Sequence, residues 1–126
     1  MWFYEVINGN TFAPPEHPGY SIVLAGNGYS GKGAGKNNPK MESVPFVGPI
    51  PRARYYIGMV FDSPKRGPKC ISLSPAPDAQ MFGRSGFLIH GDSKEHPGEA
   101  SEGCIILPRH VRDAIIASND AVLEVV

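Results

Sequence analysis

Residues 87–92 read FLIHGD and residues 101–107 read SEGCIIL, and these two stretches decide the fold. Each joins an apolar run, typical of a buried strand, to a reactive side chain and a glycine. His90 is expected to end one strand and Cys104 to begin another. The insert between them, residues 93–100, is polar and contains a Pro-Gly pair, so it is predicted to be a loop that brings the two strand ends together.

Short apolar runs of the same kind recur along the chain and predict a mainly β fold. They are rich in Ile, Val, Tyr and Phe, and Gly or Pro clusters bound them. The 15 glycines and 13 prolines make up 28 of 126 residues, about 22%. Inside a helix each Gly or Pro costs about 1 or 3 kcal/mol relative to Ala, so this content argues against a helical bundle. Further strands are predicted at residues 2–6, 20–25, 55–61, 70–73 and 122–126.

One short helix is predicted near the C-terminal end. Pro108 suits its first turn, where a missing N–H costs nothing. Val111, Ala114 and Ile115 follow at helical spacing, and the Asn-Asp pair at residues 119–120 is expected to stop the helix. No break in composition divides the chain, so residues 1–126 are expected to form a single sheet-rich or β-sandwich domain with one short C-terminal α-helix and long ordered loops.

Residues 26–51 are predicted to be the longest of these loops. Within it, residues 26–31 match G-x-G-x-x-G and residues 26–32 match G-x-x-x-x-G-K. Both phosphate-binding patterns need a helix next, and the following GAGKNNP cannot begin a stable one. Gly33 also stands where the second pattern needs Ser or Thr for magnesium. A Gly-rich surface turn is therefore favoured over a nucleotide site.

Charge and hydropathy exclude other classes of protein. The 12 basic and 12 acidic residues balance, with no basic cluster, which argues against nucleic-acid binding. No run of 18 apolar residues is present, so no membrane insertion is expected. The N-terminal residues lack the basic and apolar regions of a signal peptide, so the chain is expected to stay in the cytoplasm when made or to leave by another route.

Cys104 and His90 suit nucleophilic catalysis. A neighbouring histidine lowers the pKa of a thiol and then returns the proton to a leaving amine, so a thiolate is expected at neutral pH. Gly103 lets a carbonyl approach the backbone, and the amides of Gly103 and Cys104 are candidate oxyanion donors. Ser101 either orients His90 or makes a turn. Alone, Cys104 also fits a small buried hydrophobe.

The pattern His90-Gly91, a spacer and then SEGCI at residues 101–105 resembles the signature of the YkuD-type L,D-transpeptidases, H-G followed by S-[HN]-G-C-[IV]. Glu102 replaces the usual His or Asn, and Ile106 replaces an Arg. With YSGKG at 29–33, NNP at 37–39, GPIP at 48–51 and FGRSGFLIHGD at 82–92, the chain resembles the L,D-transpeptidase-related effectors of type VI secretion over about residues 25–125. Ala53 stands where a Gly is expected after GPIP.

This resemblance implies a β-rich fold and a Cys–His site acting on the peptidoglycan stem peptide. The thiolate would attack the carbonyl between the L-centre of diaminopimelate and the terminal D-alanine, giving a thioester. Water or a D-amino acid would then attack this thioester. It implies no cofactor and no metal. It also implies a cognate immunity protein and a secretion-apparatus component as partners. The chain would be made in the donor cytoplasm and act in the periplasm of the target bacterium.

Other residues keep two interpretations each. Arg84 binds a substrate carboxylate or stabilises a turn. Asp92 contacts substrate or steadies its loop, and Gly91 belongs to the substrate-binding set. Cys70 is a core residue or a disulfide partner of Cys104. Two other functions compete: a zinc-dependent cell-wall hydrolase, with ligands drawn from His90, His96, His110 and Cys104, and a non-enzymatic β-domain that binds the cell wall.

Overall fold

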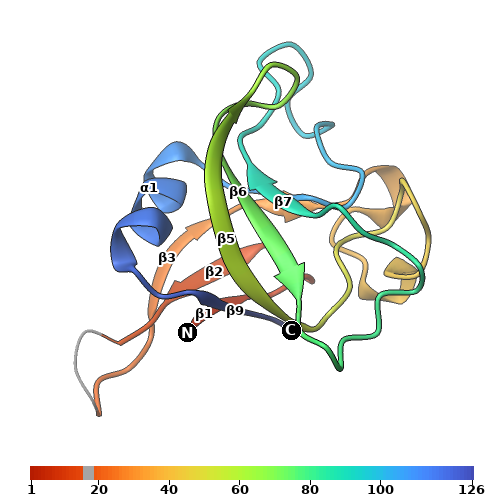
Figure 1. Ribbon diagram of the computed structural model, residues 1–126. Helices are drawn as coiled ribbons and strands as arrows, with labels where there is room; N and C mark the ends of the chain where they lie inside the picture. The colour runs from red at the N-terminus through yellow and green to blue at the C-terminus, as the bar shows by residue number, and fades with distance from the viewer. Residues whose placement is uncertain (16–18) are drawn as a thin grey trace.

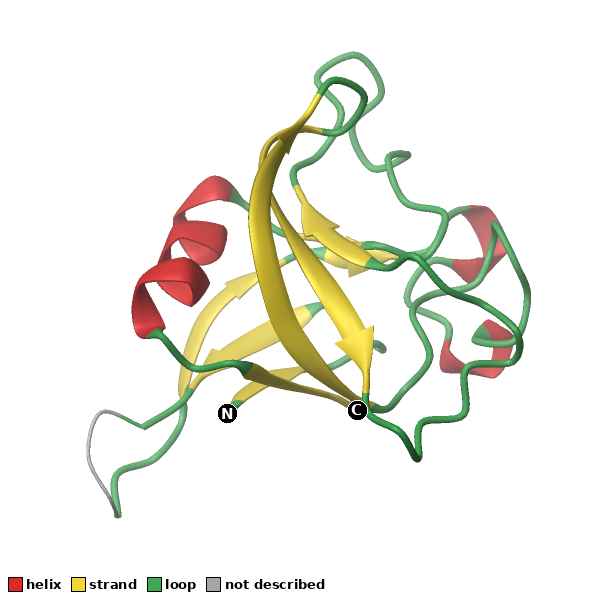
Figure 2. Ribbon diagram, in the orientation of Figure 1, coloured by secondary structure: helices red, strands yellow, loops and turns green. Residues whose placement is uncertain are grey.

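The computed structural model describes residues 1–15 and 19–126. Within these residues nine strands form one mixed sheet in the order β3-β2-β1-β9-β5-β6-β7-β8-β4, and a single α-helix lies beside it (Figures 1 and 2). The strands are β1 (Trp2–Tyr4), β2 (Asn10–Ala13), β3 (Val23–Asn27), β4 (Tyr29–Ser30), β5 (Arg54–Ser63), β6 (Gly67–Pro75), β7 (Leu88–His90), β8 (Ile105–Ile106) and β9 (Val122–Val125). The helix is α1 (Arg109–Ser118), and two 3-10 turns are η1 (Gly33–Gly35) and η2 (Pro39–Met41).

The sheet curls back on itself because its first and last strands are neighbours in sequence. Only Gly28 separates β3 from β4, yet these strands stand at opposite ends of the hydrogen-bonded order. A Cβ at Gly28 would lie 1.7 Å from the carbonyl oxygen of Ile106, so only glycine fits where β4 turns onto β8. The Gly-rich segment that resembles a phosphate loop therefore closes the sheet, and the 3-10 turn η1 follows it instead of a helix.

The mainly β fold is confirmed, and all seven predicted strands are present with shifted bounds. Two strands were missed. The short β2 has no apolar run, and β4 lies inside the segment predicted to be loop. The helix is present, but Pro108 is its N-cap (φ −61°, ψ 158°) and not part of its first turn. Asn119 ends it in the left-handed conformation (φ 55°), at the predicted stop.

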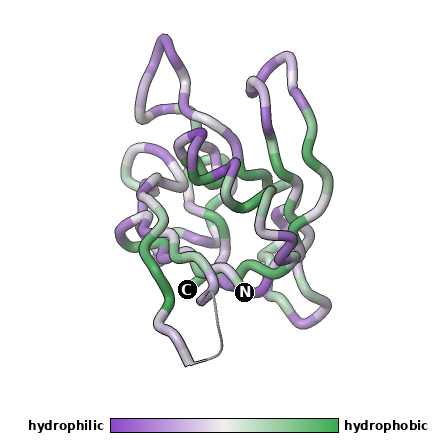
Figure 3. The backbone as a smooth tube through the Cα atoms, turned by 90° about the vertical axis from the view of Figure 1, so that its left-hand side faces the viewer, coloured by the Kyte–Doolittle hydropathy of each residue, from purple (hydrophilic) through white to green (hydrophobic). Residues whose placement is uncertain are grey.

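The register of β6, β7 and β8 separates a core face from a site face. Ile71 pairs with Ile89, and Ile89 pairs with Ile105; all three are 0% exposed in the core. Side chains alternate along a strand, so Cys70, His90 and Cys104 lie on the opposite face. The hydropathy colouring shows apolar stretches through the body of the molecule and hydrophilic stretches in projecting loops (Figure 3).

The helix and the N-terminal strands complete the core. Val111 and Ile115 of α1 and Trp2 and Tyr4 of β1 are buried in the same cluster as the three isoleucines. Strand β1 pairs in parallel with β9, so strands from both ends of the chain share the sheet. In the part of the chain that the structure describes, no helix is long and apolar enough to cross a bilayer.

Candidate active site

His90 ends β7 with both ring nitrogens engaged. The side chain is 2% exposed, and Nδ1 lies 2.8 Å from the carbonyl oxygen of Gly91. Because a carbonyl only accepts, Nδ1 carries the proton and Nε2 carries a lone pair. Burial lowers the pKa of His90, and the charges of Arg66 and Arg112 lower it further. The imidazole is therefore a neutral base with its acceptor nitrogen on the site face.

Cys104 lies directly before β8, on the same face as His90. Because Ile89 pairs with Ile105, the two residues sit on adjacent strands, offset by two positions. A strand spacing of ~4.8 Å and an offset of ~6.6 Å put their Cα atoms roughly 8 Å apart. The ring of His90 bonds Gly91 and Arg66 and not the thiol. The two side chains therefore lie on neighbouring strands with no hydrogen bond between them, an arrangement that proton transfer would have to tighten.

The resting state of Cys104 differs from the sequence expectation. Its side chain is 7% exposed, and this burial raises the pKa of the thiol. The backbone amide of Leu88 and the charge of Arg66 act in the opposite direction without reversing the shift. The resting group is a thiol rather than a thiolate, so a base has to remove its proton during attack.

Ser101 organises the turn before Cys104 and does not contact His90. Its fully buried Oγ accepts hydrogen bonds from the amides of Gly31 (2.9 Å) and Gly103 (3.1 Å) and donates to the carbonyl of Cys104 (2.5 Å). Of the two interpretations of this serine, the structure supports the turn. These contacts are those of a positioning residue, and a catalytic role for Ser101 stays a prediction.

Gly103 is required at its position but is not a free oxyanion donor. Its φ of +139° is a region that side chains rarely adopt, and a Cβ would lie 2.6 Å from Nη2 of Arg84. Its amide already donates to Ser101, and its carbonyl accepts from Ser30 Oγ at 2.8 Å. The oxyanion role of the Cys104 amide stays a prediction.

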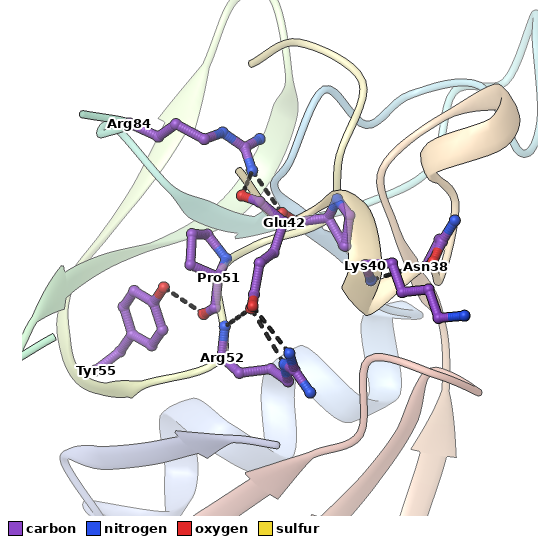
Figure 4. Close-up of polar contacts among 8 residues, drawn as sticks. Asn38, Lys40, Glu42, Pro51, Arg52, Tyr55 and Arg84 are labelled. Atoms are coloured by element: carbon purple, nitrogen blue, oxygen red, sulfur yellow. Dashed lines mark hydrogen bonds and ion pairs between the residues drawn. The ribbon is translucent and has the colours of Figure 1, made fainter. Parts of the chain in front are cut away.

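Arg84 is held by backbone carbonyls. Nη1 donates to Glu42 (2.6 Å) and Pro49 (2.7 Å), and Nη2 donates to Gly48 (3.0 Å) and Glu102 (3.2 Å). Figure 4 shows the guanidinium reaching toward Glu42, whose carboxylate pairs with Arg52. With both terminal nitrogens engaged, no bidentate fork is left for a carboxylate, which favours the turn-stabilising interpretation over substrate binding.

Asp92 likewise organises a loop. Its Oδ1 accepts from the hydroxyl of Tyr29 (2.6 Å) and the amide of Ser93 (2.8 Å), and the Gly98 amide donates to both carboxylate oxygens. The Tyr29 hydroxyl in turn accepts from the Ala100 amide at 2.9 Å. Burial, followed by the hydrogen bond to Asp92, raises the pKa of Tyr29 and keeps it a donor. These contacts fold residues 92–100 and support the loop interpretation of Asp92.

Two arginines of the site were missed by sequence reasoning. Arg66, in the turn between β5 and β6, places Nη1 3.4 Å from Nε2 of His90. Arg112 of α1 is 6% exposed and donates to the carbonyls of Leu107 (3.1 Å), Pro68 (2.7 Å) and Lys69 (3.1 Å). Arg66 lies 24 residues before His90, and Arg112 lies in the helix that follows the Ser-x-Gly-Cys stretch, so neither belongs to a motif that marks it.

Gly91 explains how Arg112 reaches the hairpin. A Cβ at Gly91 would lie 2.8 Å from Nη2 of Arg112. The glycine thus makes room for the guanidinium that joins α1 to the start of β6. Gly91 therefore has a packing role in addition to the hydrogen bond that its carbonyl accepts from His90. Its contact with substrate stays a prediction.

A cleft of about 780 Å³ opens beside His90. One wall is the β5–β6 turn at residues 64–68, and the other is the loop at residues 92–96. Figure 1 shows these two segments projecting together at the top of the molecule. Its charged lining is mixed, with the basic Lys65, Arg66, Lys94, Arg109 and Arg112 and the acidic Asp92, Glu95 and Glu99. The two arginines whose charges act on His90, Arg66 and Arg112, favour an anionic ligand beside it.

The second cysteine is buried and free. Cys70 is 0% exposed, and its thiol lies 3.3 Å from the carbonyl of Gly67. Strand β7 separates its strand from that of Cys104, a lateral distance of roughly 9.6 Å. A disulfide needs Cα atoms within about 7 Å, so the geometry favours the core interpretation of Cys70. No group of three metal-ligating side chains is present within residues 1–15 and 19–126, so the four proposed zinc ligands do not converge.

Comparison with known proteins identifies the family. The model of the Tlde1 domain matches residues 25–124, which include both His90 and Cys104. The chain belongs to the Tlde1 domain family. This family consists of type VI secretion L,D-transpeptidase effectors, as the sequence resemblance predicted. No curated protein and no solved structure matches the chain. Strands β1 and β2 lie outside the matched range, although they belong to the same sheet as the Tlde1 domain.

Family membership assigns a coarse function. A Tlde1 domain is an enzymatic type VI secretion effector with L,D-transpeptidase-like activity on the cell wall.

Proposed function

We propose that this Tlde1 domain is a cysteine-dependent enzyme that acts on the stem tetrapeptide of peptidoglycan. Cys104 attacks the carbonyl between the L-centre of diaminopimelate and the terminal D-alanine. The thiol proton passes to Nε2 of His90 as the S–C bond forms. Collapse breaks the C–N bond, and His90 returns the proton to the leaving amine. The products of this half-reaction are D-alanine and a thioester on Cys104.

The second half-reaction consumes the thioester. Water attacks its carbonyl while His90 accepts a proton, and the thiol is released with a trimmed tripeptide. A D-amino acid can attack in place of water and restore a tetrapeptide. Both routes reduce the supply of normal cross-linking substrate and weaken the wall of a competitor.

The observation that carries this proposal is the 2.8 Å contact between Nδ1 of His90 and the carbonyl oxygen of Gly91, which assigns the tautomer. Because Nδ1–H donates to Gly91, the lone pair of Nε2 lies on the face of the sheet that also carries Cys104. The lowered pKa of His90 keeps this nitrogen unprotonated near neutral pH. A buried thiol with a raised pKa needs such a base at the moment of attack.

Muropeptide chromatography tests the chemistry. Wild-type protein should release D-alanine from tetrapeptide muropeptides, and Cys104→Ala should abolish the release while remaining folded. Cys70→Ala is the matched control, because it deletes the other buried thiol and should retain activity. Retained release by Cys104→Ala would rule out the nucleophile.

The partners and the site of action belong to the same proposal. We infer a cognate immunity protein that protects the producing cell and a secretion-apparatus component that carries the effector. The domain then acts in the periplasm of the target bacterium, where its substrate lies. Expression with and without a periplasmic export signal tests this. Only the exported form should be toxic, and toxicity from the cytoplasm would contradict a cell-wall target.

A further inference from the structure

Arg66 differs from the other arginines in its surroundings. Arg52, Arg54 and Arg109 each pair with a carboxylate, and Arg84 and Arg112 are held by carbonyls. Among residues 1–15 and 19–126, the only side-chain polar partner of the Arg66 guanidinium is Nε2 of His90. The side chain is half-buried in the wall of the cleft beside His90. A guanidinium in this setting is available to an anion from outside the chain.

The proposed reaction brings an anion to this place. His90 Nε2 must give its proton to the amine of the leaving D-alanine. The carboxylate carbon of that residue is two bonds from the amine, about 2.5 Å away. Nη1 of Arg66 lies 3.4 Å from Nε2 of His90, so the guanidinium of Arg66 is beside the position that this carboxylate would occupy.

We propose that Arg66 binds the terminal carboxylate of the tetrapeptide and is the residue by which the enzyme distinguishes a free C-terminus directly after the scissile bond. The inference rests on the proposed function and adds the residue that recognises the end of the tetrapeptide. A planar guanidinium binds a carboxylate with two parallel hydrogen bonds, which fixes both position and orientation. Peptides with a longer, amidated or cross-linked C-terminus lack the carboxylate at this point.

Binding of the carboxylate also prepares the base. In the free enzyme Arg66 donates toward the Nε2 lone pair, which is the lone pair that the thiol of Cys104 requires. A substrate carboxylate is the stronger acceptor and draws the guanidinium donors to itself. Nε2 is then left to accept the thiol proton. The correct substrate therefore frees His90 Nε2 to act with Cys104.

Two substrates and three proteins test the proposal. The substrates are a tetrapeptide muropeptide and the same molecule ending in D-alaninamide. The proteins are wild type, Arg66→Gln and Lys40→Gln, a charge-matched control on an exposed residue of η2 outside the cleft. Wild type and the control should prefer the free acid by about 10- to 100-fold in kcat/KM, the range of charge-assisted hydrogen bonds. Arg66→Gln should lose activity on the acid, keep activity on the amide within about 3-fold, and so lose the preference.

Each other outcome overturns the inference in a distinguishable way. Equal cleavage of acid and amide by wild type removes the carboxylate contact and leaves the proposed function standing. A preference that survives in Arg66→Gln assigns the carboxylate to another residue. Release from neither substrate refutes the proposed function and this inference together. The acid-to-amide ratio of wild type needs no variant, so it tests the carboxylate contact even if Arg66→Gln does not fold.

Discussion

Replacing Ser101 with alanine tests the role of this buried hydroxyl. Its Oγ accepts hydrogen bonds from the amides of Gly31 and Gly103 and donates one to the carbonyl of Cys104. Alanine leaves these three backbone groups without their partner. An orphaned buried group costs about 1 to 3 kcal/mol, so after relaxation of the loop we expect a loss of roughly 3 to 5 kcal/mol in unfolding free energy. With a urea slope of about 1.5 kcal/mol per molar, the midpoint falls by about 2 to 3 M.

Urea unfolding followed by tryptophan fluorescence measures this shift. Trp2 is the only tryptophan and is 2% exposed, so its emission reports the core. Activity on tetrapeptide should fall as well, because the turn that places Cys104 loosens. Ser85→Ala removes the same atom from an exposed serine and should leave the midpoint within about 0.5 M. An unchanged midpoint with lost activity would refute this reasoning and point to orientation of His90.

Two further predictions follow from the same contacts. Arg84→Lys should lower the unfolding free energy, measured by a thermal melt, by about 2 to 4 kcal/mol, because an ammonium cannot donate to all four carbonyls. Full stability of this variant would contradict a structural role for the four hydrogen bonds. Burial lowers the pKa of His90 below its ordinary 6.5, so the unfolded state binds more protons and stability should fall as pH drops below about 6.5. His90→Gln should flatten this part of the pH–stability curve, and an unchanged slope would contradict a buried neutral His90.

The sequence predicted what local patterns encode. Apolar runs bounded by Gly and Pro located β5, β6 and β9, because burial of one strand face leaves a mark on neighbouring residues. The two motifs likewise placed His90 at the end of β7 and Cys104 before β8. The short β2 and β4 escaped because their pairing partners, and not their own residues, make them strands.

The surroundings of the site depend on contacts between distant segments. Arg84 has the residue type and position of a substrate ligand, and only the fold reveals that carbonyls 18 to 42 residues away hold it. Arg66 lies 24 residues from His90 and reaches it because the β5–β6 hairpin turns over β7. The raised pKa of Cys104 reflects burial in three dimensions, which the neighbouring residues in the sequence do not reveal.

The thioester on Cys104 is the central claim, and mass spectrometry tests it most directly. Wild-type protein is mixed with tetrapeptide muropeptide, quenched in acid, digested and mapped. The peptide that contains Cys104 should carry the mass of the substrate minus D-alanine, and hydroxylamine should remove that mass. His90→Gln should accumulate little of the adduct, because no base removes the thiol proton. D-alanine release with no acyl group on Cys104 at any time would contradict the account.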